Sequence, residues 1–123
     1  MTLRKAFEHA KRHGPSDETR QIVCKDSFYA YKYAKDIDQK PRKDTREAAC
    51  IDAMWACHYA LYIDKRPRKD TRKAACKESH WAWYYVKNID KKFRNDTWMA
   101  IKNTIYAEEY KKLFNNQMKE EII

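Results

Sequence analysis

The sequence has almost none of the residues that form tight turns. It contains one glycine and three prolines among 123 residues. The short turns that join β-strands depend heavily on these two residue types. Strands in this chain would therefore lack connectors, and the composition favours an all-α fold.

Long apolar segments are also missing. No run of apolar residues approaches the roughly 18 that a membrane-spanning helix needs. Residues 1–11 lack the apolar centre of a signal peptide. We therefore expect no membrane partner and a cytoplasmic location, with the four cysteines reduced.

Catalytic and metal-binding motifs are absent as well. The sequence contains no glycine-rich phosphate loop, no GxSxG, no HExxH and no paired CxxC spacing. His9 and His13 are four residues apart, but no third ligand is evident near them. Cys57 and His58 are adjacent, which is too little to define a nucleophile. We expect no catalytic residue, no metal, no cofactor and no enzymatic activity.

The charges that are present are mainly positive. Lysine and arginine number 27 against 18 acidic residues, so the net charge is +9. Aromatic residues make up 14% of the chain, which is too many for a disordered tail. The chain is therefore expected to fold and to attract acidic partners.

An internal repeat of 26 residues is the strongest pattern. The segment PRKDTREAAC at 41–50 returns as PRKDTRKAAC at 67–76, with nine of ten residues identical. At the same offset, residues 24–49 and 50–75 agree at 15 of 26 positions. Repetition with this period is typical of stacked supersecondary units.

Each unit is predicted to contain two helices. Apolar residues recur at helical spacing in Ser27–Ile37, Ala53–Ile63 and Ser79–Ile89. A shorter helix such as Arg46–Ile51 precedes each of them. An alternative merges the two helices into one of about 18 residues.

Several positions are predicted to begin or end these helices. Thr45, with its equivalents Thr19, Thr71 and Thr97, suits the N-cap of the short helix. Asp26, Asp52 and Glu78 suit a second cap or a bend. Leu3–His13 reads as a lone helix that stops at Gly14–Pro15, and Trp98–Phe114 reads as one long helix.

The predicted architecture is one domain, 1–123, of tandem helix pairs stacked as a short α-solenoid. About four units fit the chain. Their approximate bounds are 19–44, 45–70 and 71–96, with a C-terminal cap at 97–123.

Cys24, Cys50 and Cys76 occupy one equivalent position, 26 residues apart. Stacked helices stand about 8–10 Å apart, whereas a disulfide needs Cα atoms within about 7 Å. We therefore expect packing roles for these cysteines and no bridges between neighbouring copies.

Positions that vary between units are the ones that a partner can use. The varying positions are Phe28/Met54/His80, Tyr31/Cys57/Trp83, Lys32/His58/Tyr84 and Asp36/Tyr62/Asn88. Large side chains that the repeat does not require are candidate anchors for a protein partner. These are Tyr31, Tyr62, Trp83 and Tyr84.

The predicted loops form a second candidate surface, because each carries several cations that could contact phosphates or an acidic protein. These cations are Lys40, Arg42, Lys43, Arg66, Arg68, Lys69, Lys92 and Arg94. Aspartates recur in the same loops, so Arg42, Arg68 and Arg94 could instead form ion pairs across neighbouring units. The sequence leaves both interpretations open.

The pattern YAxxIDxxPRxDTRxAAC resembles short α/α tandem repeats of uncharacterised bacterial and phage proteins. The resemblance covers about residues 16–101 and implies a right-handed stack of helix pairs. It also implies a phage or mobile-element inhibitor or adaptor in the host cytoplasm.

The sequence therefore favours a protein-interaction scaffold that binds a host or defence protein. The alternative is a nucleic-acid-binding protein that uses a ridge of basic loops.

Overall fold

The computed structural model describes the backbone of residues 1–122 and the side chains of residues 1–119. Over this range the chain forms nine α-helices and three short π-helical segments, with 74% of residues helical and no strand. The all-α prediction is confirmed.

Longer and shorter helices alternate along the chain. The bounds are α1 Leu3–His13, α2 Asp17–Val23, α3 Ser27–Tyr33, η1 Ala34–Asp38, α4 Lys43–Ala49, α5 Ala53–Tyr59, η2 Ala60–Asp64, α6 Lys69–Ala75, α7 Ser79–Tyr85, η3 Val86–Asp90, α8 Asn95–Ile101 and α9 Ala107–Ile122. The π-helical segments η1, η2 and η3 directly continue α3, α5 and α7. Together each pair forms one long helix that ends one residue beyond the predicted isoleucine.

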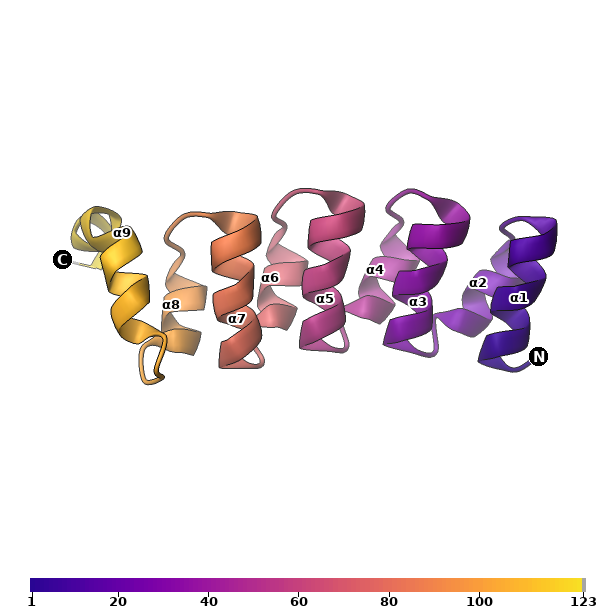
Figure 1. Cartoon of the computed structure of the whole chain (residues 1–123), viewed down its shortest axis with the longest axis horizontal. Coiled ribbons are helices and arrows are strands. Elements are labelled where there is room, and N and C mark those ends of the chain that lie inside the picture. The colour runs from indigo at the N-terminus through magenta and orange to yellow at the C-terminus, as the bar shows by residue number, and fades with distance from the viewer. Residues whose placement is uncertain (123) are drawn as a thin grey trace.

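The long helices lie side by side in a row, and the short helices lie behind them (Figure 1). Each long helix ends at the upper edge of this view, where a loop leads to the following short helix. Cα atoms of α3 and α5, and of α5 and α7, come within 8 Å of each other. We call the segments 39–44, 65–70 and 91–96 the loop edge; each is one of these loops with the first two residues of the short helix that follows it.

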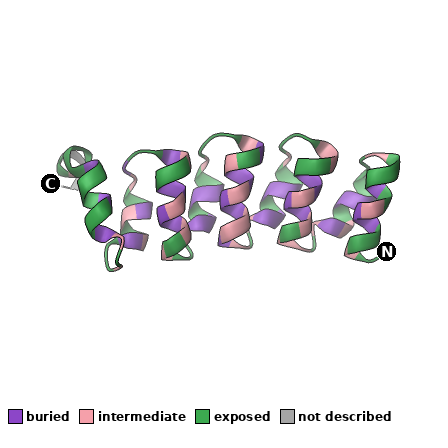
Figure 2. Cartoon of the chain, viewed as in Figure 1, coloured by how far each residue is buried: buried purple, intermediate pink, exposed green. Residues whose placement is uncertain are grey.

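The core is divided into four clusters along the row rather than gathered in one centre. Buried residues line the inner sides of both helix layers (Figure 2). A fully buried tyrosine recurs in each cluster, as Tyr33, Tyr59, Tyr85 and Tyr110. Each of these rings packs against the short helix that precedes it in the chain.

The recurring threonine is not the N-cap of the short helix, and that prediction is wrong. Arg42 holds the N-cap position of α4, and Thr45 is a fully buried residue of the first turn. The Arg42 N–H donates to the Tyr59 hydroxyl at 3.0 Å, and that hydroxyl lies 2.8 Å from the Thr45 hydroxyl. The threonine therefore serves a buried hydrogen-bond network with the tyrosine of the next long helix.

This network recurs in every short helix. Thr19–Tyr33, Thr71–Tyr85 and Thr97–Tyr110 have hydroxyl–hydroxyl distances of 2.8, 2.8 and 2.9 Å. Only α2 has a side-chain N-cap of its own, since Ser16 accepts from the Thr19 N–H. In α4, α6 and α8 the N–H of the N-cap residue therefore bonds to the tyrosine of the next long helix, while the threonine N–H bonds to the aspartate before it.

The break between short and long helix lies where the sequence predicts it. Asp52 accepts from the Trp55 N–H at 3.2 Å and from the Met54 N–H at 2.9 Å. Asp26 caps α3 in the same way, whereas Glu78 holds the equivalent position without a side-chain hydrogen bond. The two-helix prediction is confirmed, and the merged helix of 18 residues is excluded. The predicted stop of α1 at Gly14 is also confirmed.

The predicted single helix Trp98–Phe114 is wrong. The chain turns between α8 and α9, where the Thr104 hydroxyl donates to the Ile101 carbonyl at 2.7 Å. This reversal brings Tyr110 back to Thr97, so the terminal helix pair keeps the hydroxyl contact of the inner pairs. A straight helix would carry Tyr110 away from that threonine.

The three long helices in the middle of the row each end on a residue in the left-handed conformation. Gln39, Lys65 and Lys91 have φ values of 54°, 57° and 56°. A side chain in this region costs about 1–2 kcal/mol relative to a right-handed conformation. Glycine avoids that cost, and the single glycine is used elsewhere, at Gly14.

Replacing Gln39 by glycine is expected to raise the free energy of unfolding by about 0.5 kcal/mol. Relief of the left-handed strain exceeds the extra entropy that glycine gives the unfolded chain, about 0.5–1 kcal/mol. Urea denaturation measures the change. Gln39→Ala is the control: it keeps Cβ and therefore the strain, so no rise in the free energy of unfolding is expected. A loss of stability in Gln39→Gly would mean that the glutamine side chain itself stabilises the turn.

Candidate interaction surfaces

Three of the four varying positions of the repeat lie on one face of the long helices. They are spaced four residues apart in each helix, so they form a stripe along it. The stripes are Phe28, Lys32 and Asp36; Met54, His58 and Tyr62; and His80, Tyr84 and Asn88. We call these nine residues the front grid, and all of them are exposed or half-buried.

Contacts across the front grid join neighbouring helices. His58 is its centre, with ring centroids 5.8 Å from Tyr62 on the same helix and 6.3 Å from Tyr84 on the next. Trp55, which lies beside the grid, approaches Phe28 and His58 at 5.0 and 5.3 Å. The grid is therefore a connected and largely aromatic surface with few charges.

The fourth varying position is a core position, which corrects part of the candidate site. Tyr31 and Trp83 are only 7% and 6% exposed, and Cys57 between them is fully buried. Trp83 stacks on Tyr106 with centroids 6.0 Å apart. Tyr31 and Trp83 are therefore not accessible to a partner.

Tyr62 and Tyr84 remain candidates, since both belong to the front grid. Tyr62 is half exposed and Tyr84 is half-buried. The Lys35 ammonium lies 5.7 Å from the Tyr62 ring centroid. Spacing alone does not separate these residues from Tyr31 and Trp83, because buried residues of the same helices, such as Ala30 and Ala34, are also four residues apart.

Arginines of the loop edge pair mainly within their own loops. Arg42 lies 3.2 Å from Asp44, and Arg68 lies 3.1 Å from Asp70. Partial burial raises the pKa of Asp44. The Arg42 guanidinium and the Thr45 N–H lower it by more, so this pKa lies below its usual value. Arg94 instead approaches Asp90 at 3.7 Å. These arginines therefore do not form a ladder between units.

Other cations of the loop edge have no carboxylate partner among the residues that the structure describes. They come from equivalent positions of successive loops. They are Lys40, Arg66 and Lys92; Lys65 and Lys91; and Lys69. Lys43 makes only a 3.8 Å contact with Glu47, and its side chain is 87% exposed. The loop edge is thus strongly positive.

Buried ion pairs hold each long helix to the short helix before it. Arg46 donates to Asp64 at 2.6 and 3.0 Å, and Arg20 donates to Asp38 at 2.7 and 3.0 Å. The third pair is looser, because Arg72 lies 3.8 Å from Asp90 and bonds to Asp96 at 2.8 Å. These aspartates are used by the fold, so they do not reduce the positive charge of the exposed loops.

The cysteines have the properties of packing residues. Burial raises the pKa of Cys50 to about 11 and that of Cys57 to about 12, so both stay protonated near neutral pH. Within the described part of the chain, no group of three or more His, Cys, Asp or Glu side chains is placed to hold a metal ion. Nor is any helix there long and apolar enough to cross a membrane.

The comparisons do not place the chain in a family. No family model, no curated protein and no solved structure matches the sequence or the fold. The front grid and the loop edge are therefore interpreted from their own residues.

Proposed function

We propose that this protein is a short α-solenoid whose function is to bind another protein through the front grid, with an acidic partner favoured by the loop edge. One observation supports this most directly. Most buried positions repeat from unit to unit, and of the four long-helix positions at which all three copies differ, three lie exposed or half-buried on one face. Stacking constrains the shared positions and leaves this face free for specificity.

The chemistry of the front grid supports a protein partner. Tyrosine and histidine rings offer large contact areas with a polar edge, and such side chains are enriched among interface anchors. The resemblance to phage-type repeats adds the proposal that the partner is a host or defence protein and that the chain acts as an inhibitor or adaptor.

Nucleic-acid binding is the second candidate, favoured by the loop-edge cations that have no carboxylate partner among the described residues. Contacts with phosphates weaken steeply as salt rises, because condensed counterions are released on binding. Retention of a mixed-sequence oligonucleotide at about 200 mM salt, with no stoichiometric protein in a pull-down, would favour this candidate.

Changing Tyr62 and Tyr84 together to alanine is expected to weaken a protein partner's binding by about 2 kcal/mol or more, as for central interface anchors. The test is a pull-down from the native host, followed by calorimetry with the captured partner. Ile51→Ala is the matched control, since Ile51 is an exposed apolar residue outside the front grid. Unchanged affinity in a folded double variant would contradict the proposed surface.

A further inference from the structure

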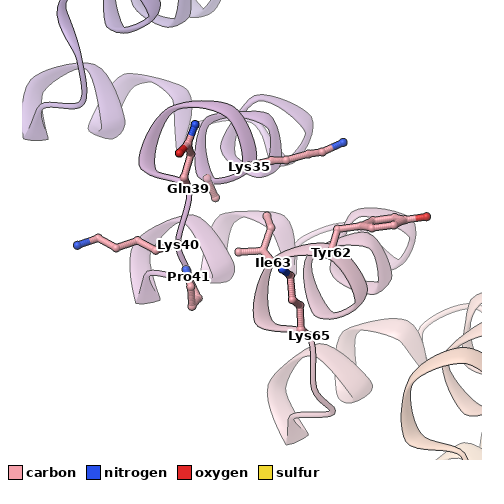
Figure 3. A pocket seen from close by; sticks show the side chains of 8 residues that line it. Lys35, Gln39, Lys40, Pro41, Tyr62, Ile63 and Lys65 are labelled. Atoms are coloured by element: carbon pink, nitrogen blue, oxygen red, sulfur yellow. The ribbon is translucent and has the colours of Figure 1, made fainter.

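Two equivalent hollows lie between successive long helices at the loop edge, each about 290 Å³ in volume. Figure 3 shows the first, between η1 and η2, and the second lies between η2 and η3. Their residues correspond at the 26-residue offset, for example Pro41 with Pro67 and Ile63 with Ile89. The repeat therefore builds the same hollow twice.

Both hollows are positive and contain an apolar floor. Lys35, Lys40 and Lys65 line the first, and Lys65, Arg66 and Lys91 line the second. No carboxylate lines either hollow among the residues that the structure describes. The nearby Asp64 faces inward, with a side chain 1% exposed and bonded to Arg46. Negative charge is thus kept away from these hollows.

Lys65 belongs to both hollows. In Figure 3 its side chain extends from its own loop toward Ile63, whereas Lys35 and Lys40 extend outward in opposite directions. The left-handed conformation of Lys65 directs the chain so that one lysine borders two successive hollows. This position carries strain that glycine would remove, yet it holds a cation.

The spacing of the hollows matches an extended peptide. Cα atoms of η1 and η2, and of η2 and η3, come within 8 Å of each other, and packed helices stand about 8–10 Å apart. A polyproline II segment rises about 3.1 Å per residue with three residues per turn. Every third side chain of such a segment therefore faces the same side, about 9 Å from the last.

We propose that the two hollows bind two acidic side chains, three residues apart, on an extended segment of the partner protein. This inference rests on the proposed function and names the chemistry of one part of the partner. The carboxylates lie beside Lys65, and the apolar stems lie against Pro41, Ile63 and their equivalents. The rest of the partner then continues onto the front grid. The grid borders the hollows, because its residues Tyr62 and Asn88 line the first and the second hollow.

A single-stranded nucleic acid fits this geometry less well. Such strands are held largely by aromatic side chains on which successive bases stack. Tyr62 supplies one ring at the first hollow, but Asn88 takes its place at the second. Asp44 and Asp70, both partly exposed, also lie on the loop edge and oppose a continuous run of phosphates.

The test is an NMR titration of the ¹⁵N-labelled full chain with a peptide of four Pro-Pro-Glu triplets. Two control peptides replace each glutamate by glutamine, or keep the composition with a glutamate at every second position, so that no two glutamates are three residues apart. We expect shifts of backbone amides around both hollows with the first peptide, and weaker binding of both controls. A poly-dT strand of twelve nucleotides is the third probe.

Lys65→Gln is expected to lower the affinity for the Pro-Pro-Glu peptide about tenfold, as loss of one charge-assisted hydrogen bond would do. Glutamine already holds the equivalent left-handed position at Gln39, so the variant is expected to fold. Lys73→Gln removes the same charge from an exposed site of α6 outside the hollows and should change binding by less than about twofold.

Three results would overturn the proposal. These are equal weakening by both variants, equal binding of the peptide with a glutamate at every second position, and tighter Lys65-dependent binding of the poly-dT strand. If a native protein partner binds Lys65→Gln with unchanged affinity but loses binding on Tyr62→Ala with Tyr84→Ala, the hollows are not the site and the proposed function stands.

Discussion

Replacing Asp64 by asparagine is expected to lower the free energy of unfolding by about 3–5 kcal/mol. Asp64 is almost fully buried and accepts two short hydrogen bonds from Arg46, whose own side chain is 11% exposed. Asparagine removes the negative charge and leaves the buried guanidinium of Arg46 without a counter-charge. Urea denaturation of the variant, with circular dichroism as the readout, measures the loss.

Asp90→Asn is the control that the repeat itself supplies. Neither Asp90 oxygen accepts a hydrogen bond from the described residues, and Arg72 lies 3.8 Å away. Burial raises the pKa of Asp90 by more than Arg72 and Arg94 lower it. The loss should therefore stay below about 1 kcal/mol. Losses of equal size in the two variants would mean that the short hydrogen bonds of Asp64 add nothing.

The pH dependence at Asp90 follows from the direction of its shift. A carboxyl whose folded pKa lies above its unfolded value contributes stability at low pH, and loses it as the pH rises through the folded pKa. Asp44 and Asp70 have lowered pKa values, so their contributions are present above the unfolded pKa and disappear as the pH falls. Asp90→Asn removes only the first of these effects.

Tyr59→Phe is expected to lower the free energy of unfolding by about 1–3 kcal/mol, the penalty for leaving a buried donor without a partner. The Arg42 N–H at the start of α4 bonds to the Tyr59 hydroxyl at 3.0 Å, and Arg42 has no side-chain cap in that place. Thermal and urea denaturation measure the change. Tyr62→Phe, in which the lost hydroxyl is on a half-exposed ring, should change stability by less than about 0.5 kcal/mol.

A double-mutant cycle separates this network from simple loss of packing. Thr45→Val removes the other hydroxyl of the 2.8 Å contact. If the two hydroxyls act together, Tyr59→Phe with Thr45→Val costs less than the sum of the single changes. Strict additivity would show that the two groups contribute independently.

Local signals in the sequence were sufficient for the helices whose ends depend on nearby residues. The one glycine stops α1, and Asp26 and Asp52 cap the long helices through their own side chains. The helical spacing of apolar residues placed the long helices to within a residue at their C-terminal ends. Each of these features acts over one or two helical turns.

Predictions that concerned contacts between helices were the ones that needed correction. Thr45 looked like a cap that accepts from a free backbone N–H. Its hydroxyl instead donates to the Arg42 carbonyl and lies 2.8 Å from the hydroxyl of Tyr59, fourteen residues later. The reversal between α8 and α9 likewise serves the contact between Thr97 and Tyr110. The repeat keeps tyrosine at one position, as Tyr33, Tyr59 and Tyr85, but it does not show which residue each of them contacts.

For the candidate surface, the 26-residue repeat by itself determined which positions vary and which are shared, because repetition is a property of the chain. Only the tertiary structure decided which varying positions are accessible. Tyr31 and Trp83 are buried against the adjacent helices, while Tyr62 and Tyr84 are not. Burial depends on the distance between helices that are 26 residues apart, and charge pairing depends on loop geometry, so neither can be derived from residue types and spacing alone.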